Sequence, residues 1–271
     1  MTQWIANARM YAVTPEVEAA WQALLAHIAE DAGVPLAYRP YPAPQPLEDL
    51  WRRPDLGCAL MCGYPIALRL ADVVAIAAPI PSAPWAQGMP RYRSDFITRA
   101  DARYANLQEA FAGSFGWTVR HSHSGFNAPR HHLLAYRQLG QTRLFAQARG
   151  DLITARRVHE AVSAGDIDCG PLDSYWRHLI ALHQPALVRN IRVLESTALA
   201  PMPAFVASAS MPAAQVTRLR DAFVCASSAP WFAALAGPLA LSGFAPAGEA
   251  DFALTLQWDK AATAAGYGAP Q

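Results

Sequence analysis

The sequence has few charged residues, and the charges that it has nearly cancel. Asp, Glu, Lys and Arg make up 16% of the 271 residues, and 22 basic side chains against 21 acidic ones leave a formal net charge of +1. A protein that binds nucleic acid or another polyanion through its surface carries a clear excess of positive charge. The composition therefore excludes that class of function, and no nucleic-acid partner is expected.

Cysteines and long apolar runs are also scarce. The four cysteines, Cys58, Cys62, Cys169 and Cys225, are too few for a disulfide scaffold, and we expect them to be small buried side chains. Every apolar stretch ends before the ~18 residues that a membrane-spanning helix needs. The N-terminal residues lack the basic start and apolar core of a secretory leader. If Met1 is the true start, a cytoplasmic location is expected.

What the sequence does contain is a regular alternation of strand-like and helical segments. This pattern is typical of an α/β fold built from parallel βαβ units. The clearest helix is predicted over residues 15–32, because Thr14 and Pro15 form a typical helix start and Gly33 a typical end. The other predicted strands include residues 5–13, 56–61, 114–119, 143–146, 167–170 and 204–208, and the other helices include residues 125–136, 174–181 and 212–225.

Two segments of the chain resemble each other. Residues 55–64 align without a gap on residues 166–175, and their Asp, Cys and Tyr match. In both, an apolar strand is followed by a tyrosine, Tyr64 or Tyr175, where a helix would begin. Ligands of open α/β sheets lie beyond the carboxyl ends of strands, so both loops are expected to line one ligand site. The alternative is a chance match, because strand-to-helix turns share residue preferences.

The segment at residues 122–126, Ser-His-Ser-Gly-Phe, has the composition of an anion-binding site. It follows a predicted strand and precedes a predicted helix. The first backbone N–H groups of a helix have no internal acceptor and carry the positive end of its dipole, and neighbouring hydroxyls add further donors. The alternative is that Ser124 or Asn127 only caps the helix.

Other chemistries fit this region less well. A zinc site needs three or four convergent ligands, whereas His131 and His132 point about 100° apart on a helix, so no metal is expected. A Ser-His-Asp hydrolase would need the G-x-S-x-G pattern, whose first glycine is missing before Ser122. Asp173 is either the N-cap of the next helix or a carboxylate for a cationic group of a ligand.

Taken in chain order, these segments resemble the phosphate- and phosphonate-binding components of ABC transporters. The resemblance runs over residues 55–210. It is carried by Tyr-Arg-Ser-Asp at residues 92–95, by the Ser-x-Ser-Gly helix start at residues 122–125, and by Gly-Asp-Ile-Asp-Cys-Gly-x-Leu-Asp at residues 165–173.

The resemblance implies a fold and its division into lobes. The expected fold is the type II periplasmic-binding-protein fold, in which two α/β lobes are joined by a two-stranded hinge and a ligand cleft lies between them. Lobe one would hold residues 1–94 and 197–271, and lobe two, inserted in it, residues 95–196.

The resemblance also implies a function. The chain would be a solute-binding protein rather than an enzyme, and it would capture a small phosphate- or phosphonate-like anion for an ABC transporter permease, or as a related sensor. No cofactor is implied, and the location would be periplasmic. Ser122, Ser124 and Gly125 would hold the anion oxygens, Tyr64 would cover the ligand, and Asp173 would meet a ligand amine. The full set of expected ligand-binding residues is Tyr11, Tyr64, Ser94, Ser122, His123, Ser124, Gly125, Phe126, Asp173 and Tyr175.

Two features depart from the family pattern. Secreted members begin with a leader that this sequence does not show, and His123 stands where the family commonly has a small hydroxyl residue. A histidine there would add positive charge at mildly acidic pH or fill the rim of the site. The alternative function is a cytoplasmic enzyme on the same fold, similar to those of menaquinone or thiamine-pyrimidine biosynthesis. The free cysteines suit it, but no clear acid–base pair supports it.

Overall fold

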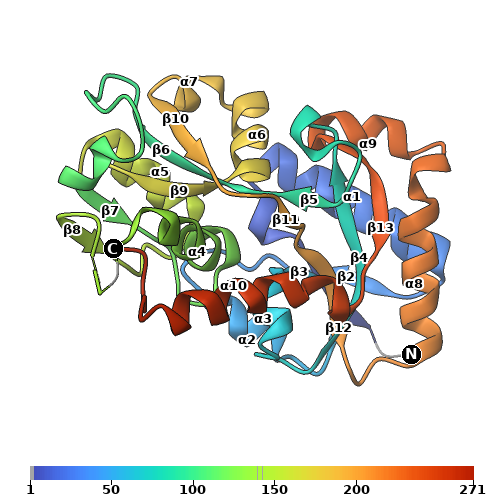
Figure 1. Cartoon of the computed structure of the whole chain (residues 1–271). Coiled ribbons are helices and arrows are strands. Elements are labelled where there is room, and N and C mark those ends of the chain that lie inside the picture. The colour runs from blue at the N-terminus through green and yellow to red at the C-terminus, as the bar shows by residue number, and fades with distance from the viewer. Residues whose placement is uncertain (1–2, 139, 142) are drawn as a thin grey trace. The chain divides into compact units, whose positions relative to one another are not determined.

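The computed structural model describes residues 3–138, 140–141 and 143–271 (Figure 1). The chain forms two compact units: unit 1 comprises Met1–Arg91 and Pro201–Ala253, and unit 2 comprises Tyr92–Ala200 and Leu254–Gln271. The chain leaves unit 1 within strand β5 (Arg91–Tyr92) and returns to it within strand β11 (Ala200–Pro201). These two strands pair with each other.

The C-terminal segment differs from its predicted place. Residues 254–271 are predicted to belong to lobe one, whereas in the structure they belong to unit 2. The reason is a set of polar contacts within unit 2. The amide of Asn127 donates to the carbonyl of Thr255, Arg130 pairs with Asp259, and the backbone N–H of Leu144 donates to the carbonyl of Gln271.

Unit 1 is built on a six-stranded mixed sheet in the order β13-β4-β12-β3-β1-β2. The first three strands along the chain run parallel, but β12 is antiparallel to β3 and β4, and β13 is antiparallel to β4. The four strands from the first part of the chain, β1 to β4, thus run in one direction, as the alternation predicts, and β12 and β13 run against them. Its strands are β1 (Trp4–Asn7), β2 (Leu36–Tyr38), β3 (Leu56–Met61), β4 (Val73–Pro81), β12 (Ala204–Ser208) and β13 (Leu241–Pro246).

Helix α1 (Pro15–Ala32) follows its sequence signals closely. The Thr14 hydroxyl accepts a hydrogen bond from the Val17 N–H at 3.2 Å, and Gly33 ends the helix in the left-handed region at φ 60°. Its apolar side packs against α8 and α9. The other helices of unit 1 are η1 (Arg9–Tyr11), α2 (Leu47–Trp51), α3 (Gly63–Ala67), η2 (Pro84–Ala86), α8 (Ala213–Cys225), η6 (Ala226–Ser228), α9 (Phe232–Leu239) and η7 (Glu249–Phe252).

The first strand is shorter than predicted. It ends at Asn7, whose side-chain oxygen accepts a hydrogen bond from the Arg9 N–H at 2.9 Å. This local bond turns the chain into the 3-10 helix η1, so Tyr11 lies in a turn rather than in a strand.

Unit 2 contains a three-stranded antiparallel sheet in the order β10-β6-β9 and a parallel pair of strands, β7 and β8. An isolated bridge between Phe115 and Cys169 links the two. The strands are β6 (Ser94–Arg99), β7 (Ser114–Gly116), β8 (Gln147–Arg149), β9 (Gly170–Asp173) and β10 (Ile191–Ser196). The helices are η3 (Glu109–Ala112), η4 (His123–Asn127), α4 (Ala128–His132), η5 (Leu133–Tyr136), α5 (Ala155–Ala164), α6 (Ser174–His183), α7 (Pro185–Val188) and α10 (Ala253–Ala264).

Two strands of unit 2 lie further along the chain than predicted. Residues 147–149, not 143–146, pair with β7. Similarly, β9 pairs with β6 over residues 170–173 rather than 167–170. In that second case the residues just before β9 bond instead to β7, because the N–H groups of Asp168 and Cys169 both donate to the Ser114 carbonyl.

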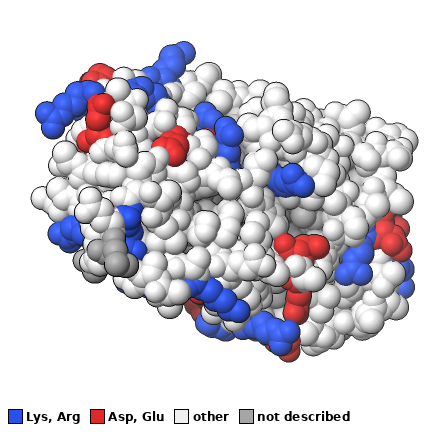
Figure 2. Space-filling model, viewed as in Figure 1, with Lys and Arg blue, Asp and Glu red and all other residues white. Residues whose placement is uncertain are grey.

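On the face shown in Figure 2 the charged side chains are dispersed. Figure 2 shows Lys and Arg beside Asp and Glu in small groups on a face that is mostly uncharged.

In the part of the chain that the structure describes, no single helix is long and apolar enough to span a membrane, although the bent pair Ala213–Ser228 and Phe232–Leu239 has the length and composition.

Candidate anion-binding site

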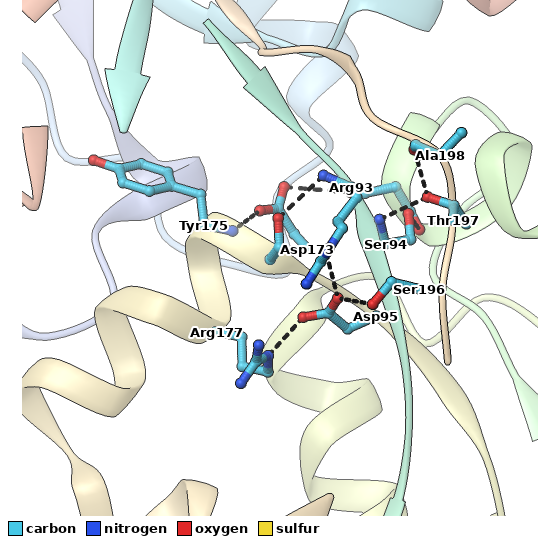
Figure 3. Close-up of polar contacts among 11 residues, drawn as sticks. Arg93, Ser94, Asp95, Asp173, Tyr175, Arg177, Ser196, Thr197 and Ala198 are labelled. Carbon is cyan, nitrogen blue, oxygen red and sulfur yellow. Dashed lines mark hydrogen bonds and ion pairs between the residues drawn. The ribbon is translucent and has the colours of Figure 1, made fainter. Parts of the chain in front are cut away.

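Ser94 and Asp173 lie opposite each other on neighbouring strands of unit 2. Ser94 begins β6 and Asp173 ends β9, and the antiparallel register pairs them directly. Both are buried. The Ser94 N–H donates to the hydroxyl of Thr197 at 3.0 Å, and the Ser94 hydroxyl donates to the carbonyl of Ser124 at 2.8 Å (Figure 3). The structure thus brings three of the predicted residues together at one edge of the sheet.

The two carboxylate oxygens of Asp173 have different neighbours. Oδ1 accepts a hydrogen bond from the backbone N–H of Tyr175 at 2.9 Å (Figure 3). It also accepts one from the N–H of Trp176 at 3.0 Å, so Asp173 is the N-cap of α6. Oδ2 lies 3.4 Å from the hydroxyl of Ser124. Capping through Oδ1 is therefore confirmed.

The cap of the Ser-x-Ser-Gly segment is Ser122. Its hydroxyl accepts a hydrogen bond from the Gly125 N–H at 3.0 Å. The prediction that Ser124 or Asn127 caps the helix is wrong. The Ser124 carbonyl and hydroxyl face Ser94 and Asp173 instead.

The predicted helix over residues 125–136 begins earlier and is irregular. Residues 123–127 form a π-turn, in which the N–H of Asn127 donates to the carbonyl of Ser122 and that of Ala128 to the carbonyl of His123. Pro129 adds to the irregularity, because proline has no N–H for the α-helical bond to the Gly125 carbonyl. That carbonyl accepts instead from the Thr118 N–H at 3.3 Å. A π-turn of this kind is common at functional sites.

Gly125 and Phe126 are held by packing inside unit 2. A Cβ at Gly125 would lie 1.9 Å from the hydroxyl oxygen of Thr118, so the space beside this glycine is already filled by the protein. The Phe126 ring packs edge-on against Trp117, with 4.9 Å between the ring centroids. The guanidinium carbon of Arg130 lies over the Phe126 ring, 5.2 Å from its centroid. The observed contacts of both residues are core contacts.

His123 is buried rather than at a rim. Its side chain is 1% exposed, and its ring stacks on Trp258 of α10 at 5.3 Å between centroids. Burial, with a smaller effect of nearby His131, lowers the pKa of His123 to about 3. Both expectations for this residue are therefore wrong: it does not fill a rim, and it gains no charge at mildly acidic pH, because a buried imidazole favours its neutral form.

The three tyrosines lie in two units. In unit 1, Tyr11 belongs to η1 and Tyr64 to the first turn of α3, which follows β3. In unit 2, Tyr175 belongs to the first turn of α6, with its side chain pointing away from the Asp173 carboxylate (Figure 3). Burial, reinforced by Asp173, raises the pKa of Tyr175 well above its ordinary value. Each similar segment does deliver a tyrosine to a helix start after a strand, and a ligand contact of these tyrosines stays a prediction.

One buried charge network has no role in the sequence-based prediction of the site. The side chain of Asp95 is fully buried, and its oxygens accept from Arg93 at 3.2 Å, from Arg177 at 2.7 Å and from Ser196 at 2.7 Å (Figure 3). Side chains alternate along a strand, so Asp95 points to the face of β6 opposite Ser94. It ties β6 to α6 and β10 behind the site. Its only sequence signal was its place in the Tyr-Arg-Ser-Asp segment.

Asp168 has a comparable structural role. Its carboxylate accepts hydrogen bonds from the N–H and hydroxyl of Ser114, both at 2.8 Å, and from the Tyr104 hydroxyl at 3.0 Å. Burial alone would raise the pKa of Asp168, but these hydrogen bonds outweigh it and lower the pKa. Among residues 3–138, 140–141 and 143–271, no three His, Cys, Asp or Glu side chains are grouped so that they could hold a metal ion.

Comparison with known proteins identifies the family. A family described as ABC transporter, phosphonate, periplasmic substrate-binding protein matches residues 12–252. No curated protein matches. A binding protein component of an ABC phosphonate transporter from Pseudomonas aeruginosa superposes with a TM-score of 0.80 at 18% identity, over 97% of this chain and 88% of that chain. PhnD1 from Prochlorococcus marinus, in complex with methylphosphonate, gives a TM-score of 0.79 at 13% identity, over 97% of this chain and 98% of that chain. A Xanthomonas citri protein bound to ATP gives 0.67 at 15% identity, over 98% of both chains.

The chain belongs to the family of periplasmic substrate-binding proteins of phosphonate ABC transporters. The resemblance drawn from the sequence motifs is confirmed, and so is the α/β, type II periplasmic-binding-protein fold. The family consists of solute-binding components rather than enzymes, which favours this function over the enzyme alternative.

Proposed function

We propose that this chain binds a small phosphonate or phosphate and that Ser94, Ser124 and Asp173 contribute to its binding site. The observation that carries the proposal is the meeting of these side chains at one edge of the unit 2 sheet, beside the π-turn of residues 123–127. The Ser124 hydroxyl, in a helical segment, is a neutral donor that can bind a phosphoryl oxygen without a net positive charge. This explains how a chain of net charge +1 would bind an anion. The Ser94 hydroxyl, whose one hydrogen goes to the Ser124 carbonyl, holds this segment in place.

The negative charge of Asp173 suggests what else the ligand carries. A carboxylate beside an anion repels it unless the ligand brings a hydrogen to share or a cationic group. The Asp173 carboxylate lies beside the proposed anion donor, because its Oδ2 is 3.4 Å from the hydroxyl of Ser124. We therefore favour a zwitterionic aminoalkylphosphonate, or a protonated phosphoryl group, over a fully ionised sulfonate.

Calorimetry with a panel of anions tests the proposal. The panel is methylphosphonate, 2-aminoethylphosphonate, inorganic phosphate, methanesulfonate and acetate, each titrated into the full chain. We expect binding of at least one phosphorus-containing anion and weaker or no binding of methanesulfonate and acetate. Uniformly flat titrations with the three phosphorus compounds would contradict the proposal.

The family also supports a location and a partner. We propose that the chain works in the periplasm and delivers its ligand to the permease of an ABC transporter. The family description, a periplasmic substrate-binding protein of an ABC transporter, supports this proposal. Cell fractionation of the native host checks the location: the protein should be released with the periplasmic contents. Recovery with the cytoplasmic contents alone would contradict it.

A further inference from the structure

Contacts from α10 fix the orientation of the Asn127 side chain. Its Nδ2 atom lies 2.8 Å from the carbonyl oxygen of Thr255 and 3.3 Å from Nδ1 of His123. A carbonyl oxygen can only accept a hydrogen bond, so the atom that faces it must be the amide nitrogen. The nitrogen carries two hydrogens and can donate one to each neighbour.

This orientation determines where the His123 ring carries its hydrogen. Since Nδ1 faces a donor, it accepts, and a neutral imidazole then carries its hydrogen on Nε2. The ring is neutral because burial, with a smaller effect of His131, lowers its pKa to about 3. The chain therefore holds His123 as a neutral Nε2–H donor.

This donor has no acceptor in the described part of the chain. Nε2 is buried, and no described residue forms a hydrogen bond with it. The neighbouring rings are those of Trp258, at 5.3 Å, and Tyr92, at 6.0 Å between centroids. Buried donors are nearly always paired in folded proteins, so an unpaired one in a binding protein points to an acceptor supplied by the ligand.

We propose that His123 contacts the ligand and donates its Nε2–H to an oxygen of the bound anion, and that Asn127 is a positioning residue that maintains this tautomer. The inference rests on the proposed function, because it places the anion at the Ser-His-Ser-Gly segment. It deepens that function by adding a preference. A hydroxyl residue at this position could donate or accept, whereas Nε2–H only donates, so His123 selects an oxygen of the ligand that carries no hydrogen.

Nitrogen NMR of the histidine rings tests the tautomer and the contact together. The full chain is labelled with ¹⁵N-histidine, and spectra are recorded without ligand and with methylphosphonate or inorganic phosphate. We expect the free His123 ring to show an unprotonated Nδ1 and a protonated Nε2, and the probe to shift the Nε2–H signals. A hydrogen on Nδ1, or a ring that does not respond to a probe that calorimetry shows to bind, would overturn the inference.

Substitutions separate the donor from the packing of the ring. His123→Phe keeps a ring against Trp258 but has no donor, and His123→Gln keeps a neutral N–H donor. We expect His123→Phe to weaken binding of the probe at least tenfold and His123→Gln to weaken it less. His131→Phe is the matched control, because His131 also stacks on Trp258, at 4.9 Å, without a proposed ligand contact; its affinity should stay within about twofold of wild type.

Asn127→Asp tests the positioning role. A carboxylate accepts where the amide donates, so the ring hydrogen should move to Nδ1 and binding should weaken together with that change in the spectrum. Weaker binding with an unchanged His123 tautomer would show that Asn127 has only a structural role. A wild-type chain that binds neither probe overturns the proposed function and this inference with it, whereas wild-type affinity in His123→Phe overturns the inference alone.

Discussion

The hydroxyl of Ser94 donates a hydrogen bond to the backbone carbonyl of Ser124 at 2.8 Å. This bond joins the first residue of β6 to the π-turn that carries the Ser-x-Ser-Gly segment. Ser94→Ala removes this hydroxyl, so the buried carbonyl of Ser124 loses its hydrogen bond from residue 94. We expect a loss of about 1–3 kcal/mol in the free energy of unfolding, measured by urea denaturation. Ser227→Ala, at an exposed serine of η6, is the control and should change stability by less than about 0.5 kcal/mol.

Ser124→Ala tests a direct contact with the anion. If the hydroxyl donates to a charged oxygen, its loss should weaken binding by about 1–3 kcal/mol, on the order of fivefold to 150-fold in Kd. Calorimetry with the tightest-binding member of the panel measures this. Because the Ser124 hydroxyl forms only a long hydrogen bond, to Asp173 at 3.4 Å, among the residues that the structure describes, Tm should change little. An unchanged Kd would leave Ser124 with a structural role alone.

Asp173→Asn separates the cap from the charge. Asparagine is as good an N-cap as aspartate, so α6 should remain intact and Tm should shift only slightly. The negative charge is lost, and affinity for 2-aminoethylphosphonate should fall relative to that for methylphosphonate. Equal changes for the two ligands would argue against a contact between Asp173 and a ligand amine.

Gly125→Ala should destabilise unit 2 through Thr118. The added methyl group would lie 1.9 Å from the Thr118 hydroxyl oxygen and 2.8 Å from its Cγ2. Overpacking of this kind destabilises by about 1–3 kcal/mol. In the double variant with Thr118→Ala both atoms are gone, so the two effects should be clearly non-additive in denaturation experiments. Additive effects would mean that Thr118 is not what excludes a side chain at this position.

The depressed pKa of His123 predicts how stability depends on pH. In the unfolded chain this ring takes up a proton near pH 6.5, whereas in the folded chain it does so only near pH 3. Between these values the unfolded state binds more protons, so stability should fall as the pH is lowered through this window, by up to about 1.4 kcal/mol per pH unit from this group. Urea denaturation from pH 7 to pH 4 measures the free energy of unfolding of wild type and of His123→Phe. The value for wild type relative to the variant should fall as the pH is lowered. Parallel curves would contradict a buried neutral His123.

Asp168 predicts a separate effect at lower pH. Its pKa is lowered in the folded chain, because hydrogen bonds from Ser114 and Tyr104 outweigh the effect of burial. Its contribution to stability is therefore complete above the ordinary carboxyl pKa of 3.8 and is lost as the pH falls through the lower folded value. Asp168→Asn should reduce Tm at pH 6, and this difference should shrink below pH 3.8. A difference that is independent of pH would mean that the charge of Asp168 is not what stabilises the fold.

Features encoded by local chemistry could be predicted from the sequence. Helix α1 begins and ends where Thr14, Pro15 and Gly33 indicate, and strands β3 and β12 have the predicted bounds. The motifs around residues 122–125 also identified the family and fold, because a short run of hydroxyl and glycine residues between a strand and a helix is a local signal. In each case neighbouring residues in the chain supply the deciding interactions.

Tertiary contacts decided the rest. Gly125 is required by Thr118, the ring of His123 is made neutral by burial and oriented by Asn127 and Thr255, and the register of β9 depends on the bonds of Asp168 and Cys169 to β7. The place of residues 254–271 in unit 2 likewise depends on partners more than a hundred residues away. The sequence by itself determined the family and the fold. Only the folded chain decided the charge and hydrogen position of His123, because desolvation and a donor from Asn127, itself fixed by α10, set them.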